Sequence, residues 1–281
     1  MVRQASNWQG GRTQGVLRQG VLLGVAAERR PERRGAAKDG RRMSLDIIHG
    51  DCLEVLPALA AGSVDCVVTD PPYGMPNYEP PTWHTENRGT CTDVTEQAWD
   101  TFSTAWVGPA SWALAESGSV LAFCKVQDVG RLRNAMHRHG IAPRHVLAWV
   151  KTTPIPRGCR PTYQSAFECI VWGARPGAWF DRPPDGRDRW NVIEGPMVRS
   201  NTERTGHPTQ KPEWLMERIL RRHCPPGGTV LDPFLGSGTT LVAAAKLGLN
   251  GIGIEREAEY VEIARKRVAR ATEQLRLEVG A

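Results

Sequence analysis

The stretch DCVVTDPPYGMP, residues 65–76, places an acid, two prolines and a tyrosine directly after a run of apolar residues. The apolar run predicts a buried strand, so Asp70 to Tyr73 stand at its carboxyl end, where open α/β sheets bind ligands. Pro71 and Pro72 fix φ and remove two N–H donors, which leaves a stiff loop that presents the Asp70 carboxylate and the Pro71 carbonyl as acceptors. These acceptors suit an exocyclic amino group, and the ring of Tyr73 offers a face for a flat base.

A second stretch, TVLDPFLGSGTT at 229–240, reads as a strand, a turn and the start of an alanine-rich helix. Gly236 and Gly238 let the backbone approach a ligand closely, and the helix N-terminus favours a negative group. No Lys follows Gly238, so the loop is not a Walker loop for triphosphates. Glu255 ends the next strand, GIGIE, where an acid can accept hydrogen bonds from both hydroxyls of a ribose. The loop and this acid together predict an adenosine-bearing cofactor.

The elements that must position these residues alternate along the chain. Short apolar strands separated by helical patterns predict an α/β fold, with a mostly parallel sheet covered by helices on both faces. The spacing predicts strands at 44–51, 63–70, 119–124, 144–151, 165–174, 229–232 and 251–255, and helices at 52–62, 97–116, 128–140, 212–223, 239–247 and 257–278.

Charge is unevenly distributed along the 281 residues, whose formal net charge is +6. The first 42 residues hold ten Lys and Arg against three acids, so the rest of the chain is close to neutral. That leading segment has Gly-Gly and Arg runs and few apolar residues, which predicts a disordered basic tail over 1–42 and a folded domain over 43–281. We favour a tail or an over-long start over a dedicated DNA-binding arm.

Cysteines and histidines give no metal-site pattern. The seven cysteines are scattered without a C-x-x-C pair, and the seven histidines form no H-E-x-x-H motif. We therefore expect no metal and a reducing cytoplasm. The apolar run GVLLGVAA near the amino end is too short to span a bilayer, so no membrane partner is expected.

Three motifs together resemble a known family. DPPY at 70–73, HPTQKP at 207–212 and DPFLGSGTT at 232–240 look like the signature motifs of S-adenosylmethionine-dependent DNA amino-methyltransferases, which methylate N6 of adenine or N4 of cytosine. Their order is similar to that of the circularly arranged β class, and the resemblance covers roughly residues 44–270. It implies a Rossmann-like methyltransferase fold, S-adenosylmethionine as cofactor and double-stranded DNA as partner. Residues 43–281 would be the catalytic domain, with target-recognition loops at about 74–98 and 174–206.

The resemblance also implies roles for individual residues. It places Asp70, Pro71, Pro72 and Tyr73 at the target base, and the segment 148–175 resembles one that helps hold a flipped base. Lys151, Arg157 and Arg160, in a proline-rich stretch with no acid close by in sequence, are candidates for DNA contacts. The implied cofactor-binding residues are Asp51, Cys52, His207, Thr209, Lys211, Asp232, Phe234, Gly236, Ser237, Gly238, Thr239 and Glu255, although Asp232 could instead be a turn or helix-capping residue.

Several alternatives stay open at this stage. Asp as the first letter of DPPY resembles the adenine enzymes, whereas Ser is commoner in cytosine-N4 enzymes, but both bases present the same amino group. Methylation of RNA or of protein glutamine is a second alternative, usually associated with Asn-Pro-Pro-Tyr placed after the cofactor loop, and an inactive nucleic-acid-binding module is a third. Methylation of cytosine C5 is set aside because no cysteine follows a proline as that chemistry typically requires. A homodimer is compatible with the sequence.

Overall fold

The computed structural model describes residues 43–72, 96–154, 163, 165–182, 190–198, 203–205, 207 and 209–279, with the backbone alone for 96–104 and 278–279. The basic tail expected at 1–42 and most of the recognition loop expected at 74–98 lie outside the described residues, as does part of the loop expected at 174–206.

The described residues form one eight-stranded sheet in the order β1-β8-β7-β2-β3-β5-β4-β6. Neighbouring strands are parallel except where β5 pairs antiparallel with β3 and β4. This confirms the predicted mostly parallel α/β sheet. The strands are β1 (Leu45–His49), β2 (Val64–Thr69), β3 (Leu114–Cys124), β4 (Ala142–Lys151), β5 (Phe167–Ala174), β6 (Val192–Gly195), β7 (Thr229–Asp232) and β8 (Asn250–Glu255).

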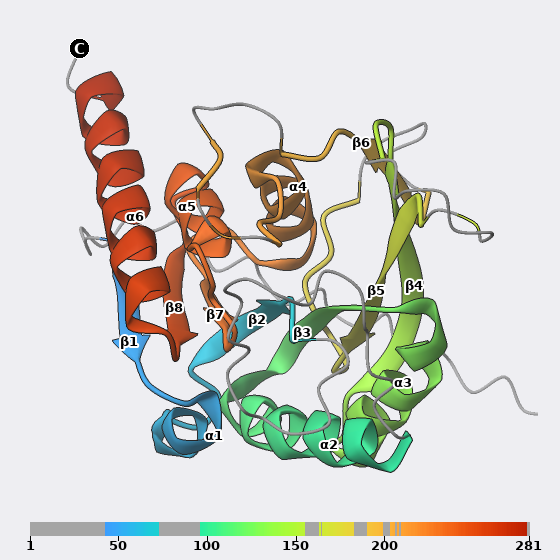
Figure 1. Ribbon diagram of the computed structural model, residues 1–281. Coiled ribbons are helices and arrows are strands. Elements are labelled where there is room, and N and C mark those ends of the chain that lie inside the picture. Colours follow the sequence, from blue (N-terminus) through green and yellow to red (C-terminus); the bar gives the residue numbers. More distant parts are fainter. Residues whose placement is uncertain are drawn as a thin grey trace, which may run out of the picture. The chain divides into compact units, whose positions relative to one another are not determined.

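Helices cover both faces of the sheet, as predicted (Figure 1). One face carries α1 (Cys52–Val55), α2 (Glu96–Ala113) and α3 (Val129–Arg138), and the other carries α4 (Glu213–His223), α5 (Thr239–Lys246) and α6 (Ala258–Val279). Short 3-10 turns lie at η1 (Leu56–Ala58) and η2 (Val126–Asp128). None of the helices in the described part of the chain is long and apolar enough to cross a membrane.

Strand β2 shows why the run CVVT folds as a central strand. Alternate side chains of a strand point to opposite faces. Cys66 and Val68 pack in the core with α4, α5 and α6, whereas Val67 packs in the core with α1, α2 and α3. Because both faces are buried, the strand reads as continuously apolar and not as an alternating pattern.

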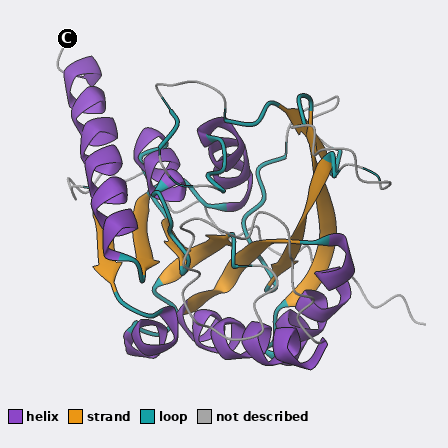
Figure 2. Cartoon of the chain, viewed as in Figure 1, coloured by secondary structure: helices purple, strands orange, loops and turns teal. Residues whose placement is uncertain are grey.

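The strand order reverses between β7 and β2, which are parallel neighbours with Cys66 opposite Val230. From β7 it passes through α5 to β8 on one side, and from β2 it passes through α2 to β3 on the other (Figure 2). The helices that follow these two strands therefore lie on opposite faces of the sheet, and such switch points are where open α/β sheets bind ligands. The two motifs of the sequence follow these two strands.

Two strands differ from the sequence-based prediction. Strand β6 lies within 174–206, which the sequence predicts to be irregular, and it has only four residues that pair with β4 from Ala148 opposite Val192 onward. Strand β3 begins at Leu114, where the sequence predicts the end of a helix.

Candidate active site

Asp70 follows the last residue of β2, and a hydrogen bond joins this strand end to the neighbouring one. Thr69 Oγ1 donates to Asp232 Oδ1 at 2.8 Å, across the boundary between β2 and β7. Pro71 is buried and Pro72 half-buried, whereas Tyr73 lies outside the described residues. The residue before the DPPY motif is thus hydrogen-bonded to the first residue of DPFLGSGTT.

Asp232 is buried, with 3% of its surface exposed, and both of its oxygens accept hydrogen bonds. Besides Thr69, the backbone N–H of Phe234 donates to Oδ1 at 3.1 Å and Thr240 Oγ1 donates to Oδ2 at 2.6 Å. Burial outweighs these donors and raises the pKa of Asp232 to about 6. In this arrangement the carboxylate holds the loop between β7 and α5 in shape.

The two glycines of the loop differ in what surrounds them. Both have positive φ, +54° at Gly236 and +85° at Gly238, a region in which other residues are strained. A Cβ at Gly238 would lie 2.9 Å from Ala264 Cβ on α6, so this position needs glycine for helix packing as well as for its backbone angle. A Cβ at Gly236 would lie 3.0 Å from Nε2 of His207, so the HPTQKP segment closes directly over the loop there.

Glu255 ends β8 beside the glycine loop. Its Oε2 accepts from the backbone N–H of Gly236 at 2.7 Å and its Oε1 from that of Glu257 at 2.8 Å. The side chain is half-buried, and this burial raises its pKa. The carboxylate therefore lies at the end of its strand as predicted, and each of its oxygens accepts a hydrogen bond from a backbone N–H.

Strand β1 brings the first of the predicted cofactor residues to the same edge of the sheet. The backbone N–H of Gly50 donates to the Glu255 carbonyl at 2.9 Å, so the ends of β1 and β8 are adjacent. Asp51 caps α1, with Oδ1 accepting from the N–H of Leu53 at 2.9 Å. Cys52 is buried in the core on that side.

His207 packs its ring against Tyr260 with 4.4 Å between ring centroids. Its Nδ1 is buried and has no hydrogen-bond partner among the residues that the structure describes. Burial, helped by the positive charges of Lys211 and Arg267, lowers its pKa to about 4, so the ring is neutral at physiological pH. Thr209, two residues on, is exposed.

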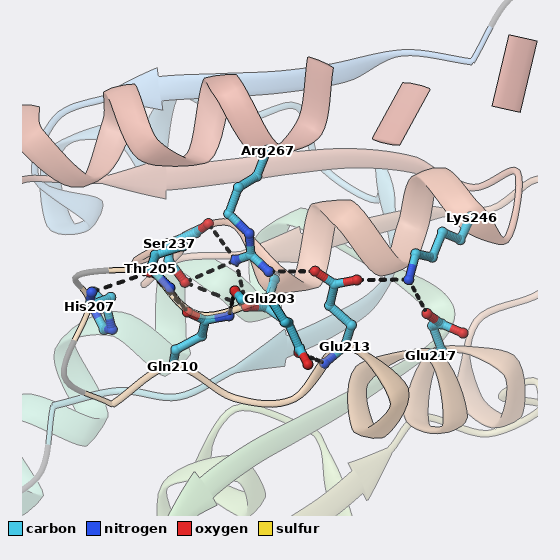
Figure 3. A network of polar contacts seen from close by, with 10 residues as sticks. Glu203, Thr205, His207, Gln210, Glu213, Glu217, Ser237, Lys246 and Arg267 are labelled. Atoms are coloured by element: carbon cyan, nitrogen blue, oxygen red, sulfur yellow. Dashed lines mark hydrogen bonds and ion pairs between the residues drawn. The ribbon is translucent and has the colours of Figure 1, made fainter. Parts of the chain in front are cut away.

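Arg267 of α6 ties the glycine loop to α4 (Figure 3). Its guanidinium donates to the Ser237 carbonyl at 2.8 Å, to Ser237 Oγ at 3.1 Å and to Thr239 Oγ1 at 3.0 Å. It also forms an ion pair with Glu213 at 2.6 Å. The sequence did not single out Arg267, because it is one of several basic residues on α6 and only packing distinguishes it.

The segment before α4 is held by its own side chains, also seen in Figure 3. Gln210 accepts from the N–H and the hydroxyl of Thr205, both at 2.9 Å, and donates to the carbonyl of Glu203 at 2.8 Å. Glu203 Oε1 in turn accepts from the N–H of Glu213 at 2.6 Å, which satisfies a free donor at the start of α4. These bonds fix where His207 and Lys211 lie.

Lys211 contacts acids on two different elements. Its ammonium forms ion pairs with Asp70 and, at 3.2 Å, with Glu168 of β5. Glu168 also pairs with Lys151 at 2.7 Å. Although no acid is close to Lys151 in sequence, the antiparallel pairing of β4 with β5 brings Glu168 beside it. Arg157 and Arg160 lie outside the described residues.

The sequence profile of the DNA methylase family with N6 and N4 specificity matches residues 64–266. The Type II methyltransferase M2.DpnII of Streptococcus pneumoniae is 31% identical over 242 residues, which cover 79% of this chain and 88% of that protein. M2.LlaDCHI of Lactococcus lactis subsp. cremoris, also a Type II methyltransferase, is 30% identical over 243 residues, with the same coverage.

Solved structures agree with this match. The M1.HpyAVI–SAM complex aligns with a TM-score of 0.62 and 29% identity over 80% of this chain and 98% of that one. The cytosine-N4-specific PvuII DNA methyltransferase shares the fold, with a TM-score of 0.64 and 18% identity over 83% of this chain and 94% of that one. The predicted resemblance is confirmed: this chain belongs to the DNA methylase family of N6 and N4 amino-methyltransferases.

Proposed function

We propose that this protein transfers a methyl group from S-adenosylmethionine to the exocyclic N6 of adenine at specific sites in double-stranded DNA. The observation that carries the proposal is the link between the two motifs at the switch point of the sheet. Thr69, next to Asp70, donates to Asp232 at the start of the glycine loop. An acceptor for an amino group and a loop for an adenosine-bearing cofactor thus start from neighbouring strand ends.

The described residues fit S-adenosylmethionine. The Glu255 carboxylate ends its strand where it can accept hydrogen bonds from ribose hydroxyls, and Gly236 and Gly238 carry no side chain of their own that would keep a ligand from the loop backbone. The buried Nδ1 of His207, without a partner in the described part of the chain, is available to a polar group of the ligand. When bound, this cofactor supplies a methyl group made electrophilic by a positively charged sulfur.

At the target base, the proposed groups of the DPPY motif are hydrogen-bond acceptors. The Asp70 carboxylate and the Pro71 carbonyl would each accept a hydrogen bond from one N–H of the amino group, which leaves the nitrogen lone pair free to react. Holding the amino group in position supplies much of the acceleration expected of such a site. The base must leave the duplex stack to reach these groups, at a cost of about a few kcal/mol.

Adenine is favoured over cytosine by the Asp that opens the DPPY motif, since Asp70 resembles the adenine enzymes of the family. Both bases present an amino group of the same local geometry, so the contacts of Asp70 serve either one. The product therefore has to be identified chemically.

We also propose which groups face the DNA. Lys151, Arg157 and Arg160 are the proposed phosphate or base-edge contacts, and the loops at 74–98 and 174–206 the proposed reading elements. Lys151 is paired with Glu168, so a phosphate would have to compete with that ion pair. A homodimer and a cytoplasmic location likewise stay predictions.

The test uses the full chain with radiolabelled S-adenosylmethionine on duplex DNA, matched RNA and a mixture of proteins, followed by mass spectrometry of the digested product. We expect label in N6-methyladenine of duplex DNA. Asp70→Ala should abolish transfer while the Kd for the cofactor changes by less than about threefold. Asp46→Ala, at an exposed acid of β1 outside the site, is the matched control and should transfer normally.

Each other outcome is distinct. N4-methylcytosine would keep the mechanism and overturn the choice of base, and label in RNA or protein would overturn the substrate. Normal turnover by Asp70→Ala would show that Asp70 has no role in methyl transfer. Failure to bind the cofactor, with no transfer to any substrate, would favour an inactive nucleic-acid-binding module.

A further inference from the structure

Four charged side chains alternate in sign next to the candidate site: Asp70, Lys211, Glu168 and Lys151, hereafter the four-charge chain. Asp70 pairs with Lys211, Lys211 lies 3.2 Å from Glu168, and Glu168 lies 2.7 Å from Lys151. The members come from the loop after β2, the segment before α4, strand β5 and strand β4. The four-charge chain has no net charge, because it holds two acids and two lysines. Its members lie far apart in the sequence.

Lys211 is the least exposed member, with 8% of its side chain accessible, and its ammonium lies 4.9 Å from the centroid of the Phe123 ring. Burial alone would disfavour its charge, but Asp70 and Glu168 outweigh that effect and raise the pKa of Lys211. Likewise, Lys211 and Lys151 overcome the burial of Glu168 and lower the pKa of that acid. Lys211 and Glu168 therefore carry their charges at neutral pH, because each of these buried charges has partners of opposite sign.

We propose that Lys211 is a positioning residue for Asp70: it holds the carboxylate ionised and oriented as an acceptor for the target amino group, and Glu168 orients Lys211 in turn. This inference rests on the proposed function, in which Asp70 receives the amino group. It departs from the role that the family resemblance implies for Lys211, which is to close over the methionine end of the cofactor.

The physical reason lies in what would remain without the ammonium. Asp70 and Glu168 both contact Lys211, so its removal leaves two carboxylates near one another without the cation between them. Like charges in a partly buried site are relieved when one carboxylate takes up a proton. A protonated Asp70 would donate a hydrogen bond where the amino group needs an acceptor.

Other titratable groups also face Asp70 and must be separated from Lys211 in any pH experiment. Asp232 of β7 and Cys124 of β3 both interact electrostatically with Asp70. Burial raises the pKa of the Cys124 thiol, which keeps it neutral. Asp232 titrates at about 6, so Asp232→Asn is needed to show which part of the pH profile it contributes.

The experiment measures kcat on duplex DNA as a function of pH, and the Kd for S-adenosylmethionine by calorimetry, for full-length variants. Lys211→Met should lower kcat roughly 100-fold at neutral pH and move the acidic limb of the profile to higher pH, with a cofactor Kd within about threefold of wild type. Glu168→Gln removes the second carboxylate and should move that limb the other way, to lower pH. The double variant should recover about tenfold of the lost kcat, because Asp70 is then no longer close to the like charge of Glu168.

Two further variants complete the set. Lys211→Arg keeps the charge and should retain more activity than Lys211→Met. Arg265→Met removes an exposed cation that pairs with Glu262 outside the site, and it should leave kcat, its pH profile and the cofactor Kd unchanged.

A cofactor Kd raised tenfold or more by Lys211→Met with an unmoved pH profile, on the order of the loss of a direct ligand contact, would overturn the inference and assign Lys211 to the cofactor. A double variant no better than Lys211→Met would also overturn it. Should Lys211→Met fail to fold, the direction of the shift in Glu168→Gln decides. Wild-type protein that transfers no methyl to DNA would instead overturn the proposed function, and the inference with it.

Discussion

At the scale of single residues, the structure explains why an acid stands at each of two neighbouring strand ends. Asp70 has Lys211 as its counter-ion, whereas Asp232 is enclosed by donors from β2 and from its own loop. The first acid is the proposed acceptor for the target amino group, and the second holds the loop. Asp232 is the more unusual, because it is an almost fully buried carboxylate whose hydrogen-bond partners in the described part of the chain, Thr69, Phe234 and Thr240, are all uncharged.

Replacing that acid by its amide should change how stability depends on pH. The folded-state pKa of Asp232, about 6, lies above its ordinary value of 3.8, so its contribution to stability is fully present below that ordinary value and is lost as pH rises through 6. Asp232→Asn lacks this contribution but can keep the bonds to Oδ1. The excess unfolding free energy of wild type over Asp232→Asn should therefore fall by up to about 3 kcal/mol between about pH 4 and pH 7.

Urea denaturation of both proteins across this pH range measures the difference. His207 and His223, whose pKa values are lowered to about 4 and about 3, titrate in both proteins and cancel in the comparison. A difference that is constant with pH would mean that Asp232 stays ionised throughout.

The sequence predicted those site residues that depend only on their own strand and turn. Asp70 and Glu255 each follow an apolar run, so their place at a strand end could be predicted from the local pattern. Glu168 and Arg267 could not, because their partners lie at least 17 residues away in sequence and are brought near only by strand pairing and helix packing. An acid inside the apolar run FECIVW was the one local signal that Glu168 is special.

At the scale of elements, α6 packs against the glycine loop and stabilises it. Its Ala264 packs against Gly238, and its Arg267 donates to Ser237 and Thr239 while pairing with Glu213 of α4. The loop shape therefore depends on a helix that begins about 20 residues later in the chain.

Two arginines on this helix provide a matched comparison. Arg267→Met removes one partner of a largely buried ion pair and the loop donors, which should cost about 2–4 kcal/mol of stability and weaken cofactor binding. Arg265 pairs with Glu262 with about half of both side chains exposed, so Arg265→Met should cost less than about 0.5 kcal/mol. Chemical denaturation and calorimetry measure both effects, and equal costs for the two variants would show that the Arg267 contacts do not hold the loop.

The alternation of apolar runs and helical patterns was enough to predict the α/β sheet and its two helical layers. It could not give the direction of β5, because a fully buried strand such as CIVWGA has the same pattern whether it pairs parallel or antiparallel. Strand β6 was missed because its four residues stand between Trp190 and Pro196 in a polar stretch, and only its pairing with β4 makes it a strand.

At the scale of the whole molecule, the positive charge is concentrated in residues 1–42, ahead of the described domain. If that segment is not a DNA-binding arm, its removal should leave catalysis intact. We expect deletion of 1–42 to change kcat and KM for DNA by less than about twofold and to leave the salt dependence of KM unaltered. Steady-state kinetics at low and physiological salt test this, and a flatter salt dependence after deletion would identify the segment as a phosphate-binding arm.

The most direct test of the central claim is to express the full chain in a host without DNA methylation and to sequence its genomic DNA for modified bases, beside the same host carrying Asp70→Ala. We predict N6-methyladenine within one short sequence motif, and none in the Asp70→Ala host. N4-methylcytosine in place of N6-methyladenine would contradict the choice of base. Unmodified DNA, from a folded protein that binds S-adenosylmethionine, would contradict the account of a DNA-modifying enzyme.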